Sequence, residues 1–140
     1  MGERLEIPDA IHSNFEIVRV IGKGTFGVCL LGQRKHDAKL FAIKQIRVSV
    51  RRAVERKYVF NEVRLLSNLH HPNVIAYHDC FVAECALPLR QPHQVLEEHR
   101  LVSIVMEFAD AGDLNDKINS AKEVHFPENV CVNINLLVQT

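Results

Sequence analysis

The chain has 140 residues, of which 47% are apolar, which is enough for one hydrophobic core but too little for two complete domains. Its 17 Lys and Arg residues balance 17 Asp and Glu residues, which argues against a nucleic-acid or membrane-surface binder and favours small-molecule or protein partners. The four cysteines lie far apart without a CxxC pair, and no apolar run approaches the roughly 20 residues that span a bilayer, so we expect free thiols in a soluble, cytoplasmic protein.

The first half of the chain is predicted to form a three-stranded meander. Phe15 to Ile21 is rich in β-branched and aromatic residues and leads into a glycine cluster, which is typical of a strand that ends at a functional turn. Val28 to Leu31 resumes the apolar character, and residues 32–39 form a polar turn. Leu40 to Val48 then alternates in polarity as a third strand would.

One amphipathic helix is predicted after the third strand. Ser49 is a suitable N-cap residue. From Ala53 to Leu69 the apolar positions recur near helical spacing, at Val59, Val63, Leu66 and Leu69. Pro72 ends the helix, because proline lacks an amide donor and excludes the helical conformation from the residue before it.

Two more strands are predicted in the second half, over Val74 to Val82 and Leu101 to Ala109. A long charged loop over residues 83–100 would join them. Asp110 to Asp113 is read as a turn and helix start. After Pro127, four apolar residues fall on one helical face, namely Val130, Ile134, Leu137 and Val138.

A glycine-rich segment follows the first predicted strand. Gly22 to Gly27 satisfies G-x-G-x-x-G, a pattern in which backbone amides can approach phosphate oxygens because no β-carbons intervene. The pattern alone is a weak signal. A dinucleotide-binding fold would need a helix directly after the third glycine and an acidic residue about 20 positions further on. Here strand-like VCLL follows, and the neighbourhood of Arg47 is basic.

The segment FAIK, which ends at Lys44, strengthens the interpretation of the glycines as a phosphate-binding segment. Strand alternation places Ala42 and Lys44 on one face, so that a flat base could lie against the small residue while the ammonium group reaches phosphates. A lysine in that position needs a carboxylate to hold it. Glu62 on the predicted helix is the candidate partner.

Taken together, the motifs resemble the small lobe of a protein kinase, and they are most similar to the NIMA-related (NEK) serine/threonine kinase family. The matching segments IGKGTFG, FAIK, NEVRLLSNLHHPNVIAYHD and IVMEFADAGDL occur in the family's order and close to its spacing. The resemblance implies an α+β fold, with a five-stranded antiparallel sheet, one packed helix, a hinge and a short start of the helical large lobe. The implied boundaries are an N-terminal extension over 1–14, the small lobe over 15–109, and the hinge with the large-lobe start over 110–140.

The resemblance also implies an ATP site. The glycine segment would cover the triphosphate, and the candidate catalytic residues Lys44 and Glu62 would pair beside the phosphates. Met106 would be the gatekeeper behind the adenine, the backbones of Glu107 and Ala109 would hydrogen-bond its edge, and Asp113 would reach the ribose. The full candidate ATP-binding set is Ile21, Gly22, Lys23, Gly24, Thr25, Phe26, Gly27, Val28, Cys29, Ala42, Lys44, Met106, Glu107, Ala109 and Asp113.

Cys29 stands where the family motif has a valine that packs on the adenine. We interpret it as a packed small hydrophobe rather than a reactive thiol, although its position above the nucleotide leaves the second interpretation open.

The strings HRDLxxxxN and DFG, which supply the catalytic base and the magnesium ligands in the family, do not occur in the 140 residues. At the family level we expect ATP-dependent phosphorylation of protein serine or threonine, with ATP and a protein substrate as partners. Mg²⁺ is expected only together with the rest of the large lobe, and no kinase activity is expected from this chain alone. The alternative is a non-catalytic nucleotide-binding or protein-docking fragment that acts through loop 83–100 and the apolar tail.

Overall fold

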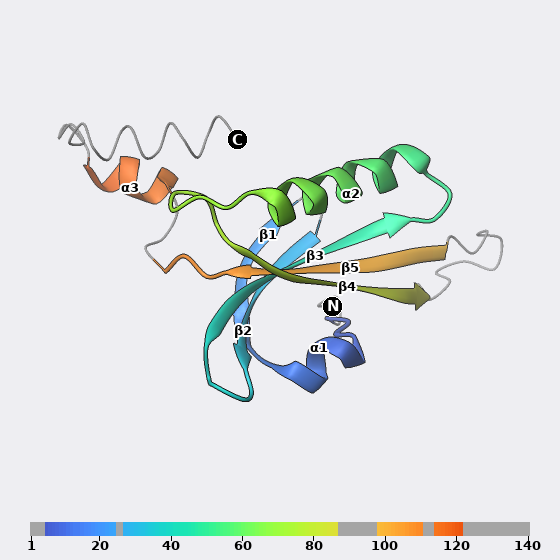
Figure 1. Cartoon of the computed structure of the whole chain (residues 1–140), viewed down its shortest axis with the longest axis horizontal. Helices are drawn as coiled ribbons and strands as arrows, with labels where there is room; N and C mark the ends of the chain where they lie inside the picture. The colour runs from blue at the N-terminus through green and yellow to red at the C-terminus, as the bar shows by residue number, and fades with distance from the viewer. Residues whose placement is uncertain (1–4, 25–26, 87–97, 111–113, 122–140) are drawn as a thin grey trace.

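The computed structural model describes residues 5–24, 27–86, 98–110 and 114–121. The elements in these ranges are α1 (Asp9–Asn14), β1 (Phe15–Gly24), β2 (Gly27–Arg34), β3 (Leu40–Ser49), α2 (Ala53–Asn68), β4 (Tyr77–Ala86), β5 (Glu98–Glu107) and α3 (Leu114–Ala121). The strands form one antiparallel sheet in the order β1-β2-β3-β5-β4, with α2 packed against one face (Figure 1). The predicted α+β fold, with one packed helix between the third and fourth strands, is confirmed.

Strand β3 lies in the middle of the sheet, and its alternate residues enter two different cores. Successive residues of a strand point to opposite faces, so Ile43 and Ile46 belong to separate clusters. The first cluster contains Ile11, Phe15, Leu30, Phe41, Ile43 and Val105. The second contains Ile46, Val48, Val59, Val102 and Ile104. Both faces of the central strand are therefore covered.

Helix α2 buries the face that its sequence predicts. Val59 is buried, and Val63 and Leu66 pack against the same cluster. The predicted N-cap is wrong, because Ser49 is the last residue of β3 and pairs with His99 of β5. That pairing keeps Ser49 extended, and the helix starts four residues later, at Ala53.

The hairpin of β4 and β5 is longer than predicted. The loop expected over residues 83–100 is too long at both ends, because β4 continues to Ala86 and β5 already begins at Glu98. Glu84 pairs with Arg100 within this added length. Main-chain pairing tolerates polar side chains on an edge strand, so the charges that suggested a loop do not interrupt the ladder. Residues 87–97 lie outside the described ranges.

The segment before β1 packs on the sheet instead of standing apart from it. Ile11 of α1 has no exposed surface and joins the first cluster, on the face opposite α2 (Figure 1). Further towards the N-terminus, Nε2 of the buried Gln45 donates to the carbonyl of Glu6 at 3.4 Å. Residues 5–14, expected as an extension, therefore complete one side of the core.

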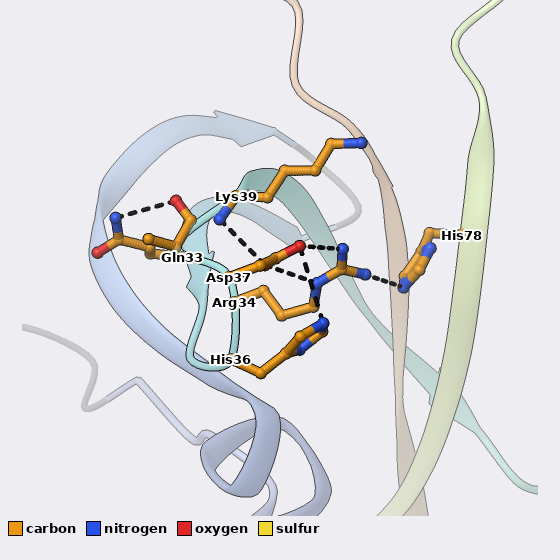
Figure 2. Close-up of polar contacts among 7 residues, drawn as sticks. Gln33, Arg34, His36, Asp37, Lys39 and His78 are labelled. Carbon is orange, nitrogen blue, oxygen red and sulfur yellow. Dashed lines mark hydrogen bonds and ion pairs between the residues drawn. The ribbon is translucent and has the colours of Figure 1, made fainter.

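The turn between β2 and β3 is held by Arg34, as Figure 2 shows. The guanidinium donates to both carboxylate oxygens of Asp37, at 3.0 and 2.5 Å, and this bond holds the pKa of Asp37 well below its usual range. The third guanidinium nitrogen, Nη1, lies 3.2 Å from Nε2 of His78. A guanidinium can only donate, so Nε2 of His78 is the acceptor, and the turn is tied to the beginning of β4.

Candidate functional site

The glycine segment forms the end of the β1–β2 hairpin. Gly22 pairs with Cys29 and Gly24 with Gly27, while Thr25 and Phe26 lie outside the described residues. A β-carbon at Gly27 would lie 1.9 Å from the carbonyl oxygen of Gln45, so only glycine allows this approach to β3. The corresponding position at Gly24 has no heavy atom within 4 Å. The hairpin is thus closely packed on one arm and open on the other.

Two rows of side chains beside the hairpin contain four of the other predicted site residues, Cys29, Ala42, Lys44 and Met106. Ala42 pairs with Leu31 on one side and Met106 on the other. One step along the strand, Lys44 pairs with Cys29 and Ile104. Paired residues in an antiparallel sheet point to the same face, so both rows lie on the α2 face. Ala42 and Lys44 share a face, as the alternation predicted.

Lys44 and Glu62 meet between β3 and α2. The Nζ atom of Lys44 lies 2.6 Å from Oε1 of Glu62, and their side chains keep 39% and 27% of their surface exposed. An ion pair as exposed as this contributes roughly 0–1 kcal/mol to stability. Its main effect is geometric, because it sets the position of the ammonium group relative to the glycine hairpin.

Cys29 lies beside Lys44 and is partly buried. Burial raises the pKa of its thiol, and the nearby positive charge of Lys44 lowers that pKa by a smaller amount. The thiol is therefore mainly protonated at neutral pH, which fits a packing role better than a nucleophilic one.

The predicted hinge residues follow at the end of β5. Met106 is half-buried and packs against the cluster under α2, and Glu107 is the last residue of the strand. Ala109 and Asp110 continue the chain as exposed residues, and Asp113 lies outside the described ranges. The structure therefore places Met106 opposite Ala42, on the face of the sheet that Lys44 shares, but it does not test the position predicted for Asp113.

A cavity of about 870 Å³ opens beside the glycine hairpin, and the sequence did not predict it. Its walls include Gly24 and Gly27 of the hairpin, Leu5 of the N-terminal segment, and Val54 and Tyr58 of α2. Ala42, Lys44 and Met106 are not among its lining residues, so it is separate from the predicted adenine position. Sequence periodicity could not reveal it, because the walls come from segments that are far apart in the chain.

The described ranges lack two kinds of feature, a metal-holding cluster and a membrane-spanning helix. They contain no group of three or more His, Cys, Asp or Glu residues placed to hold a metal ion. They also contain no helix with the length and apolar character needed to cross a membrane.

Comparison with known proteins gives a consistent picture. Residues 15–139 match the family model described as "Protein kinase domain". The chain is 38% identical over 104 residues to "Probable serine/threonine-protein kinase nek3" of Dictyostelium discoideum, which covers 74% of this chain. It is 35% identical over 120 residues to "Serine/threonine-protein kinase Nek3" of Mus musculus, covering 86% of the chain. It is 32% identical over 114 residues to "Serine/threonine-protein kinase Nek5" of Homo sapiens, covering 81%.

The matches cover only a small part of each relative. The aligned residues span 8% of the Dictyostelium protein, 20% of the mouse protein and 14% of the human protein. The similarity therefore concerns one portion of these kinases.

Proposed function

The chain belongs to the protein kinase family, and on this basis we propose that its small lobe binds ATP. The observation that supports the proposal most directly is the ion pair of Lys44 with Glu62 next to a glycine hairpin. A lysine held by a carboxylate presents its charge at a fixed place, and backbone amides at glycine positions can approach anionic oxygens. Together these features suit a polyphosphate.

In the proposed complex, the adenine lies along the row of Leu31, Ala42 and Met106, where a small residue between two larger ones leaves space for a flat ring. The amides of the glycine hairpin cover the phosphates. The ammonium group of Lys44 contacts phosphate oxygens, and Glu62 keeps it there. Main-chain groups of Glu107 and Ala109 bond the adenine edge, and Asp113 bonds the ribose.

We further propose that a chain that also contains the catalytic motifs HRDLxxxxN and DFG transfers the γ-phosphoryl group of ATP to serine or threonine of a protein substrate. The relatives named above, which are serine/threonine kinases, support this assignment. The part of Lys44 in that reaction is to stabilise negative charge on the phosphates, because phosphoryl transfer depends mainly on positioning and electrostatics. Mg²⁺, when bound, would neutralise part of the negative charge of the phosphates. The described residues offer no cluster suited to it, and the roles proposed for Lys44 and Glu62 do not depend on it.

A thermal-shift titration of the 140-residue chain with Mg-ATP tests the binding proposal. Ligand that binds only the folded state raises the unfolding midpoint, with a stabilisation of about 2.7 kcal/mol at 100 times the Kd. We expect a concentration-dependent rise for the natural chain and almost none for Lys44→Met. The matched control is Lys57→Met, which removes an exposed lysine of α2 and should keep the full rise.

The outcomes separate the parts of the proposal. A natural chain without any midpoint rise would contradict ATP binding by these residues. A rise of equal size in Lys44→Met would contradict the role of Lys44 while leaving binding itself in place.

A further inference from the structure

The main-chain bonding where β4 begins and β5 ends departs from a regular antiparallel ladder. The amide of Glu107 donates to the carbonyl of Ala76 at 2.8 Å. In a regular hydrogen-bonded pair, the amide of Ala76 would return a bond to the carbonyl of Glu107. Here the amide of Ala76 donates to Oε2 of the Glu107 side chain, at 3.1 Å. The carboxylate therefore stands in for the carbonyl of its own residue.

We propose that Glu107 is a positioning residue of the nucleotide site, whose carboxylate occupies the Ala76 amide so that the main-chain carbonyl of Glu107 accepts from the exocyclic amine of adenine. This inference rests on the proposed ATP binding. The contact of this carbonyl with the base belongs to the proposed ATP binding, and the inference adds the role of the carboxylate, which keeps the Ala76 amide from competing for the carbonyl.

The location of Glu107 fits this role. It directly follows Met106, which is the last member of the row of Leu31, Ala42 and Met106. The base lies along this row in the proposed complex. The backbone of Glu107 is therefore at the end of that row. The side chain is exposed, and its Oε2 accepts from the Ala76 amide, which in the proposed complex leaves the main-chain carbonyl for the base.

The chemistry of the Glu107 side chain explains why the Ala76 amide donates to the carboxylate and not to the carbonyl of Glu107. An ionised carboxylate has no donor and forms stronger bonds to amides than a neutral carbonyl does. When the carboxylate is removed, the Ala76 amide needs another acceptor, and the nearest one in a regular ladder is the carbonyl of residue 107. Truncation of Glu107 should therefore redirect this carbonyl rather than unfold the sheet.

Two nucleotides that differ only at the exocyclic amine test the inference. Thermal-shift titrations of the 140-residue chain would measure the Kd of ATP and of purine riboside triphosphate, which lacks that amine. The variants are Glu107→Ala, which removes the carboxylate, and Glu107→Gln, whose amide oxygen can still accept from Ala76. The control is Glu84→Ala, which removes an exposed carboxylate of β4 that lies opposite Arg100, away from the hinge.

We expect Glu107→Ala to weaken ATP binding about fivefold, the value of one hydrogen bond, and to change the Kd of purine riboside triphosphate less than about twofold. Glu107→Gln should restore most of the ATP affinity, and Glu84→Ala should change neither Kd. Equal losses for both nucleotides in Glu107→Ala, or no loss for either, would overturn the positioning role while ATP binding stands. A natural chain that binds neither nucleotide would overturn the proposed function together with this inference.

Discussion

At the scale of single residues, Lys44 influences two neighbours in different ways. It forms an ion pair with Glu62 across the gap between β3 and α2, and it lies opposite Cys29 on the adjoining strand. Its charge lowers the pKa of the Cys29 thiol, but burial raises that pKa by more. The ammonium group of Lys44 therefore pairs with the Glu62 carboxylate, and it partly offsets the effect of burial on the pKa of Cys29.

The alkylation rate of Cys29 should report this balance. Removal of the positive charge in Lys44→Met should raise the thiol pKa further and slow the reaction with iodoacetamide at pH 7.5, because only the thiolate reacts. Peptide mass spectrometry would follow Cys29, with Cys80 as the internal reference. The pKa of Cys80 is raised by burial and by Asp79, so its rate should not change. Faster alkylation of Cys29 in the variant would contradict the electrostatic account.

At the scale of elements, Gly24 and Gly27 of the hairpin differ in whether their surroundings require glycine. Gly27 sits against the main chain of β3, where the carbonyl of Gln45 leaves no room for a β-carbon. Gly24 faces open space. The sequence pattern treats both as equivalent positions of one motif, whereas the packing requires glycine only at Gly27.

Substitution of each glycine by alanine should therefore have unequal effects. Gly27→Ala should destabilise the chain by roughly 1–3 kcal/mol, because the added methyl group overlaps a backbone atom that cannot move freely. Gly24→Ala should stay within about 0.5 kcal/mol of the natural chain. Urea unfolding followed by circular dichroism would compare the two. Similar losses in both variants would mean that the contact with Gln45 does not limit the hairpin.

The strands, α2 and the pairing of Lys44 with Glu62 could be predicted from the sequence because they depend on local periodicity and on motifs of fixed spacing. The ends of β4 and β5 could not, since main-chain pairing extends through charged residues such as Glu84 and Arg100. The burial of Ile11 was missed because one apolar residue in a short helix carries no periodic signal. The bond from Ala76 to Glu107 joins segments distant in the chain, and only the folded structure brings them together.

At the scale of the whole molecule, the sheet has a core on each face. Helix α2 covers one face, and α1 with the residues before it covers part of the other. Ile11 is the deepest contact of α1, and it packs with Phe15 and Ile43. The N-terminal residues are therefore part of the structural unit that supports β3, the strand that carries Lys44.

Substitution of Ile11 by alanine should show how much α1 contributes to the unfolding free energy of the chain. Ile11→Ala is expected to cost roughly 2–5 kcal/mol of unfolding free energy, because it removes buried methyl groups and leaves a cavity in the first cluster. The neighbouring His12→Ala changes an exposed side chain of the same helix and should have little effect. Equal unfolding midpoints for the two variants would show that α1 is dispensable.

The strand order has a consequence for the path of folding. β1, β2 and β3 can assemble as a local meander and β4 with β5 as a local hairpin, but β3 joins β5 only after the intervening helix and hairpin have closed a long loop. Pairing across such a loop is slow, because the entropy of closure is lost before any contact rewards it. The row of Leu31, Ala42 and Met106 crosses that junction. The position proposed for the adenine is therefore completed only when the two halves of the sheet meet, and a nascent chain that has not reached β5 contains Lys44 but lacks that position.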